Sequence, residues 1–120
     1  MDVEAKDWEA QVLKPEVPVL VDFWHETCIW CKRLEPELLK VAEHFAGKLR
    51  FAKLNVRASH DNMRIAQRYG IMGTPTLILF CNGRPVSELV GYRPRDRLTR
   101  EVQGLMETYE ACLKQSTPLS

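Results

Sequence analysis

The sequence predicts a single α/β domain in which helices flank a mixed β-sheet of about four strands. Two near-continuous apolar runs are each followed by a helical pattern, as in parallel strands that are joined by crossover helices. Two later strand-like segments flank Asn82-Gly83, a dipeptide typical of a tight hairpin turn. A chain of 120 residues has the length of one domain and can bury a sizeable core.

The first half of the chain supplies the two βα units. Trp8 and Val12 stand four residues apart and predict a short amphipathic helix over 6–13. The run 18–24 reads "PVLVDFW", which is typical of a strand that is covered on both faces. Apolar residues then recur at helical spacing from Leu34 to Phe45, before a second apolar run, "KLRFAKLNV", at 48–56.

The second half supplies a helix, the hairpin and a final helix. A helical pattern covers about 59–69 and ends at Gly70, which is typical of a helix stop. The hairpin is predicted over 76–90, and apolar residues keep helical spacing from 98 to 113. We expect a loose tail at 115–120.

Composition and charge exclude several functions. The residues are 45% hydrophobic and 28% charged, and no apolar run approaches the ~20 residues that span a bilayer. A net charge of +1 gives no field that would gather nucleic acid or an anionic membrane, and the arginines of "YRPRDRLTR" are expected to form a solvated helix start. The acidic N-terminus lacks a secretory pattern, so we expect a cytoplasmic location. We also expect a monomer.

Cys28 and Cys31 lie where the first apolar run gives way to a helix. The spacing fits a metal half-site, a structural disulfide or a working dithiol. Reduced thiols prevail in the cytosol, which disfavours a permanent bridge. A helix amino end favours a thiolate, so Cys28 can attack a disulfide, while Cys31, one turn further in, can resolve the intermediate.

The segments "VLVDFW", "CKRLEPEL", "FAKLNV", "YGIMGTPTLILF", "NGRPV" and "VGY" occur in this order over roughly 19–106. Together they resemble the thioredoxin family. The resemblance implies the thioredoxin fold, with a central mixed sheet of four to five strands, and thiol-disulfide exchange with protein disulfides. It also implies a redox-active disulfide between Cys28 and Cys31 with no other cofactor, and a thioredoxin-reductase-like electron donor that is a flavoprotein or depends on ferredoxin.

By the same resemblance, Asp22 matches the buried acid behind the active site and Lys53 the lysine near it. Desolvation raises the pKa of such a carboxyl, and the lysine opposes this, so Asp22 can exchange a proton with Cys31. The alternative is a buried ion pair with no role in the chemistry.

Four further residues match the family's substrate surface. Pro75 matches a cis-proline that faces the cysteines, which leaves the backbone of Thr74 free to pair with an extended substrate segment. Gly73 and Gly91 would allow a partner's backbone to approach closely.

The sequence departs from the family at Ile29-Trp30, where thioredoxins usually have Gly-Pro between the cysteines. That dipeptide tunes the redox poise, so the sequence does not set the direction of electron flow. Trp30 forms either an exposed platform for substrates or a contact with a neighbouring loop. The Thr27 hydroxyl can cap the helix, and His25, as an imidazolium, can favour the thiolate of Cys28.

The main hypothesis is therefore a protein-disulfide oxidoreductase that acts as a reductase. One alternative is a metal or iron-sulfur protein that uses the two cysteines as ligands, and another is a redox-silent scaffold or chaperone. Cys81 and Cys112 do not provide a second close ligand pair. We expect them to be small packing or surface residues, with an intermolecular disulfide possible for either.

Overall fold

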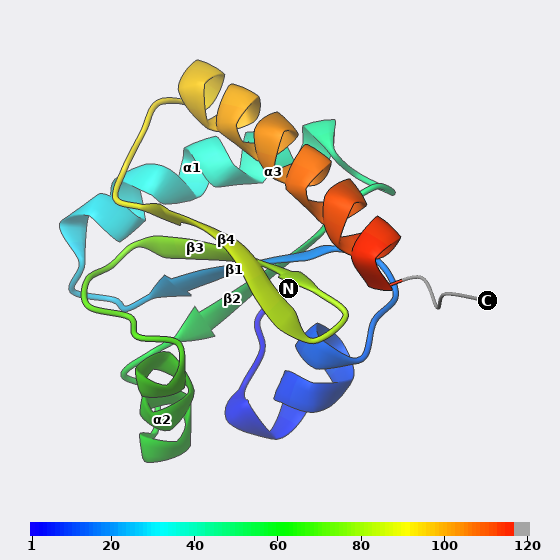
Figure 1. The fold of residues 1–120 in the computed structure, drawn as a ribbon. Helices are drawn as coiled ribbons and strands as arrows, with labels where there is room; N and C mark the ends of the chain where they lie inside the picture. The colour runs from blue at the N-terminus through cyan, green and yellow to red at the C-terminus, as the bar shows by residue number, and fades with distance from the viewer. Residues whose placement is uncertain (117–120) are drawn as a thin grey trace.

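The computed structural model describes residues 1–116, without the side chains of 114–116. Figure 1 shows the sheet with helices on both faces. The elements are two short helical segments, η1 (Ala5–Asp7) and η2 (Glu9–Leu13), followed by β1 (Val19–Trp24), α1 (Ile29–His44), β2 (Arg50–Asn55), α2 (His60–Arg68), β3 (Thr76–Cys81), β4 (Arg84–Val90) and α3 (Arg95–Ser116). Among the described residues, no helix is long and apolar enough to cross a membrane.

The four strands form one mixed sheet in the order β2-β1-β3-β4. β1 pairs in parallel with β2, and β3 pairs antiparallel with both β1 and β4. The predicted α/β thioredoxin fold with a mixed sheet is confirmed. At the outer edge of β2, the amide of Val3 donates to the carbonyl of Lys53, and the Lys53 amide donates to the carbonyl of Met1, at 2.9 and 2.8 Å.

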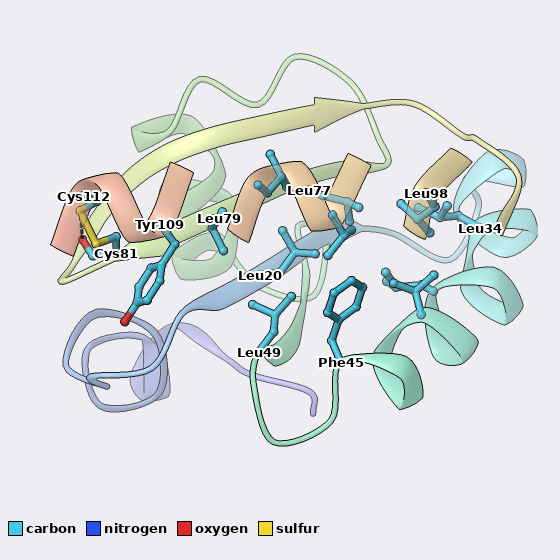
Figure 2. Packing of buried hydrophobic residues seen from close by; sticks show 14 residues of the cluster. Leu20, Leu34, Phe45, Leu49, Leu77, Leu79, Cys81, Leu98, Tyr109 and Cys112 are labelled. Carbon is cyan, nitrogen blue, oxygen red and sulfur yellow. Dashed lines mark hydrogen bonds between the residues drawn. A yellow bond between two sulfur atoms is a disulfide. The ribbon is translucent and has the colours of Figure 1, made fainter. Parts of the chain in front are cut away.

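The alternation of side chains along β1 divides the core into two clusters, one on each face of the sheet. Leu20 belongs to the cluster beneath α1 and α3, which Figure 2 shows from close by. Val19, Val21 and Phe23 belong to the cluster covered by α2 and the two N-terminal segments, which lie below the sheet in Figure 1. Asp22 has the same parity as Leu20 and therefore points toward α1.

The predicted hairpin turn is present, and α2 has a side-chain cap that was not predicted. Asn82 and Gly83 have φ values of 50° and 79°, and positive φ at both central positions is the type I′ geometry. Ser59 caps α2, because its side chain accepts a hydrogen bond from the amide of Asn62 at 3.0 Å.

The predicted helix over 6–13 is present, as a 3₁₀ turn followed by a π turn in which the Lys14 amide donates to the carbonyl of Glu9. Trp8, between the two turns, keeps helical backbone angles and is buried against the rings of Phe23, Tyr69 and Phe80. Of the tail expected at 115–120, residues 115 and 116 belong to α3, and 117–120 lie outside the described residues.

A candidate dithiol site at the amino end of α1

Cys28 and Cys31 form a disulfide at the start of α1, just after the loop that follows β1, with their Cα atoms 5.2 Å apart. Cys28 is the N-cap residue of α1, and its Sγ accepts a hydrogen bond from the amide of Cys31 at 3.1 Å. Cys28 is 8% exposed and Cys31 is 4% exposed. The Cys31 amide and the positive end of the helix dipole therefore lie next to the Cys28 sulfur, where they stabilise a negative charge once the bridge is opened.

The sheet register brings the Thr74-Pro75 segment to the same edge. Phe23, near the end of β1, pairs with Thr76 at the start of β3, so the residues just before Thr76 lie beside the loop that carries Cys28. The Thr74-Pro75 bond is cis. The amide and carbonyl of Thr74 make no hydrogen bond to any residue that the structure describes.

Hydrogen bonds from Gly91 and Arg93 fix the position of Pro75. The Gly91 amide donates to the Pro75 carbonyl at 2.8 Å, and Arg93 Nη1 donates to the Gly91 carbonyl at 2.9 Å. Gly91 has φ +91°, a conformation that favours glycine. Nothing lies within 4 Å of the position where Gly73 would carry a Cβ, so the space beside it is open.

Of the arginines predicted to form a solvated helix start, Arg95, Arg97 and Arg100 are exposed as expected, whereas Arg93 is buried. Nε of Arg93 and Nε of Arg97 pair with the two carboxylate oxygens of Glu101 at 2.9 and 2.7 Å, and Arg95 pairs with Glu37 at 3.1 Å. These contacts tie the start of α3 to the loop after β4 and to α1. The cluster is therefore largely neutralised by its own neighbours.

Asp22 lies beneath Cys31 in the interior, only 3% exposed. Its Oδ1 has no hydrogen-bond partner among the described residues. Burial raises the pKa of this carboxyl to about 7; the charge of Lys53 opposes the rise and that of Glu35 adds to it. A pocket of about 10 Å³, close to the smallest that holds a water molecule, is lined by both Asp22 and Cys31 but not by Cys28.

Lys53 contacts the same pocket from β2. Its Nζ forms an ion pair with Glu35 Oε1 at 2.8 Å and lies 4.4 Å from the centre of the Trp24 ring. Trp24 also lines the pocket. Lys53 is therefore close to Asp22, but its ion pair is with Glu35.

Exposed apolar side chains surround the disulfide. Trp30 is half exposed, and its ring stacks on Tyr92 at 5.6 Å between centres, with the Arg33 guanidinium 4.8 Å from its centre. The contact with Tyr92 agrees with the interpretation that Trp30 packs against a neighbouring loop, whereas its role as a platform for substrates stays a prediction. Met72, next to Gly73, is 97% exposed.

Of two suggested roles near the cysteines, the cap at Thr27 was wrong, and the charge on His25 is less favoured than in a free histidine. Thr27 does not cap α1, because its hydroxyl faces His25 Nδ1 at 3.1 Å and accepts from Arg57 Nη1 at 3.0 Å, while Cys28 takes the cap position. Desolvation lowers the pKa of His25 and the nearby Arg57 lowers it further, against the opposing charge of Glu26. A charged imidazolium is therefore disfavoured at this position.

Two contributors to the site were missed from the sequence. Glu35, which pairs with Lys53, stands four residues after Cys31 and so on the same helix face; that spacing was an available clue. The contact of Tyr92 with Trp30 joins segments far apart in sequence, and no local pattern indicates it.

The other two cysteines are buried and pair with each other. Cys81 and Cys112 form a disulfide with Cα atoms 6.6 Å apart, which confirms their packing role but not the intermolecular bond that was left open. Within residues 1–116, no group of three or more histidine, cysteine or acidic side chains is placed to hold a metal ion, so nothing favours the metal-binding alternative.

A disulfide between a helix cap and the first turn, at an edge with unpaired backbone beside it, can be opened by a thiolate and closed again. Proteins that use a dithiol in this way are thiol-disulfide oxidoreductases. The family model described as thioredoxin matches residues 1–104.

Curated relatives agree. The thioredoxin of Alicyclobacillus acidocaldarius is 41% identical over 97 residues, covering 81% of this chain and 90% of the relative. That of Streptomyces clavuligerus is 42% identical over 93 residues, covering 78% and 83%. That of Haemophilus influenzae is 36% identical over 98 residues, covering 82% and 89%. The chain belongs to the thioredoxin family and is a thiol-disulfide oxidoreductase.

Proposed function

We propose that this chain reduces disulfides in other proteins, with Cys28 as the attacking sulfur and Cys31 as the resolving sulfur. The observation that carries the assignment is the asymmetry of the pair. Cys28 caps α1 and accepts an amide hydrogen bond, whereas Cys31 lines the pocket that holds the Asp22 carboxyl. One sulfur is placed to exist as a thiolate, and the other is placed to lose a proton late in the reaction.

The reaction takes two exchanges. The Cys28 thiolate attacks one sulfur of the target disulfide, which forms a mixed disulfide and releases the other target sulfur as a thiolate that takes up a proton. Asp22 then accepts the proton of Cys31, and the Cys31 thiolate attacks the Cys28 sulfur. The second target thiolate leaves, and two electrons have passed from the dithiol to the target.

Asp22 suits this proton transfer because its pKa of about 7 lies near the operating pH of a neutral compartment. The pocket between Asp22 and Cys31 has room for one bridging water. We assign Lys53 a positioning role, since its charge limits the rise in the pKa of Asp22.

The target binds across the edge of the sheet. The free amide and carbonyl of Thr74 offer one step of strand pairing to an extended segment, beside the cis Pro75. Gly73 and Gly91 leave room for the partner's backbone, and Trp30 offers its exposed face to an apolar side chain. An open pocket of about 300 Å³, lined in part by Gly73 and Thr74, extends this surface.

We propose that a thioredoxin-reductase-like donor returns two electrons to the Cys28–Cys31 disulfide, that this disulfide is the only redox group needed, and that the chain acts as a monomer. The family membership supports the donor and the cofactor. A cytoplasmic location stays a prediction from the sequence.

Reduction of insulin disulfides, with dithiothreitol as the electron source, tests the assignment. Cys28→Ser is expected to abolish the acceleration over dithiothreitol alone. Cys31→Ser is expected to stop after one exchange and to accumulate a covalent complex that dithiothreitol releases. Undiminished turnover by Cys28→Ser, or a covalent complex that accumulates through Cys31 in the Cys28→Ser variant, would refute the assignment.

A further inference from the structure

A second disulfide joins the last residue of β3 to the C-terminal half of α3. The Cα atoms of Cys81 and Cys112 are 6.6 Å apart, within the range in which two cysteines can be bridged. Cys81 is fully buried and Cys112 is 5% exposed. Figure 2 shows this bridge at one end of the core cluster and Leu34, which lies one turn beyond Cys31, at the other end.

This second bridge is remote from the dithiol site. Thr76 starts β3 next to Phe23, at the sheet edge that carries Cys28. Cys81 is five residues further along β3, a distance of roughly 17 Å at the rise of an antiparallel strand. Neither of its two sulfurs can therefore exchange directly with Cys28 in the same molecule.

We propose that Cys81 and Cys112 are a second redox site, at which oxidation by a low-molecular-weight disulfide clamps α3 to the sheet and raises the stability of the fold. The two cysteines are 31 positions apart, and the segment between them contains β4 and most of α3. A crosslink over a segment of this length removes conformational freedom mainly from the unfolded chain.

The surroundings of the bridge support a clamp at this point. One turn before Cys112, the Tyr109 hydroxyl donates to the carbonyl of Glu16 at 2.6 Å, which attaches the same part of α3 to the segment before β1. Leu105 and Tyr109 are buried in the same hydrophobic cluster as the two cysteines. The bridge therefore joins elements that are already packed together and does not require them to move.

The residue next to the bridge indicates which sulfur reacts first. Arg84 Nη2 lies 3.4 Å from Cys112 Sγ, and its positive charge favours a thiolate there. The Cys112 thiolate attacks one sulfur of glutathione disulfide and displaces glutathione. Cys81 then loses its proton, attacks the Cys112 sulfur and displaces the second glutathione. Two protein thiols lose two electrons and two protons, and one disulfide becomes two thiols.

A chain carrying both Cys28→Ser and Cys31→Ser isolates this pair. It is equilibrated with glutathione and glutathione disulfide at several ratios, alkylated, and examined by mass spectrometry and thermal unfolding. We expect both remaining thiols to become protected together, in a peptide that links Cys81 to Cys112. We also expect oxidation to raise the unfolding midpoint by roughly 10 °C.

The matched control is Cys112→Ala in the same background. It loses packing under all conditions but cannot form the crosslink, so its unfolding midpoint should be the same in both redox buffers. Glutathione held on Cys112 without the crosslink, a covalent dimer, or an unchanged midpoint on oxidation would overturn the proposal. So would a redox-dependent midpoint that persists in Cys112→Ala.

The insulin assay separates this proposal from the proposed function. Cys81→Ala/Cys112→Ala in an otherwise unchanged chain should keep its rate of insulin reduction within about twofold, because Cys81 lies at the end of β3 remote from the sheet edge that carries Cys28. Loss of activity in that double variant would contradict the independence of the two sites.

Discussion

Lys53 lies directly beside Asp22 in the register of β1 and β2, yet its ammonium group forms its ion pair with Glu35, 2.8 Å away. The lysine charge is thus shared between two carboxyl groups of unequal exposure. Glu35 is partly open to solvent, whereas Asp22 is buried and its Oδ1 lacks a hydrogen-bond partner among the described residues. Asp22 therefore remains a weak acid although a cation lies nearby.

Replacing Asp22 with Asn should stabilise the protein increasingly as the pH rises. Because the folded-state pKa of Asp22 is raised, the folded protein binds a proton more tightly than the unfolded chain does. That contribution to stability is complete below pH 3.8 and is lost as the pH rises to about 7. The free energy of unfolding of Asp22→Asn, relative to the wild type, should therefore increase by about 4 kcal/mol across this window.

Urea unfolding between pH 3.5 and 8.5 measures this difference. The control is Glu107→Gln, which removes an exposed carboxylate from α3 and should show no comparable trend. A difference between Asp22→Asn and the wild type that does not change with pH would show that Asp22 titrates alike in the folded and unfolded chains.

Glu35→Gln should lower the pKa of Asp22 below about 7. The substitution removes a negative charge that raises this pKa, and it frees Lys53 from its ion pair. NMR titration of the Asp22 side-chain carbon measures the change directly.

Two further variants fix the sign of that effect. Lys53→Met should move the pKa of Asp22 upward, because the lysine charge lowers it in the wild type. Glu37→Gln, on the same helix but paired with Arg95, should leave it in place. Shifts in the same direction for Glu35→Gln and Lys53→Met would contradict the electrostatic explanation.

Trp30→Ala should slow the reaction with protein disulfides but not with small ones. Loss of one aromatic contact to a bound segment corresponds to roughly a three- to tenfold decrease in the second-order rate constant. Insulin and 5,5′-dithiobis(2-nitrobenzoate) are suitable paired substrates. The control is Leu39→Ala, which removes another exposed apolar side chain from α1. An equal loss with both substrates would assign Trp30 to the chemistry of the cysteines.

Asn62→Ala should destabilise the fold while leaving the site intact. Asn62 is fully buried, accepts from the Ala5 amide at 2.8 Å, and donates to the Asn55 carbonyl at 3.0 Å and to Glu4 Oε2 at 2.8 Å. Its loss leaves the partly buried amide of Ala5 and carbonyl of Asn55 without this partner, which costs roughly 1–3 kcal/mol in the free energy of unfolding.

Urea unfolding and insulin reduction together test this role of Asn62. The control is Gln67→Ala, an exposed position on the same helix, for which we expect little change in stability. A decrease in the rate of insulin reduction that exceeds the population unfolded would contradict a purely structural role.

The sequence predicted the sheet and its main helices because each element has a clear hydrophobic period. All of β1 except Trp24 is buried, so its apolar run is nearly continuous. Cys28 and Cys31 could be placed because a local motif stands at the junction of a strand and a helix. The roles of Asp22, Lys53 and Pro75 came from the family resemblance and stay predictions.

What the sequence could not provide depends on contacts between distant segments. The partners of Asn62 include residues 57 and 58 positions away, and the Cys81–Cys112 bridge spans 31 positions. The side chain of Trp8 contacts three rings from other parts of the chain. Periodicity records which face of an element is buried, and it carries no information about which neighbour covers that face.

The hydrogen bonds of Met1 and Val3 to Lys53 have a consequence for self-association. They occupy the outward backbone groups of β2 near its middle, where an intruding strand from another molecule would otherwise add to the sheet. At the opposite margin, β4 carries Pro85, which has no amide to offer. Both edge strands of the sheet therefore disfavour the addition of strands from other molecules.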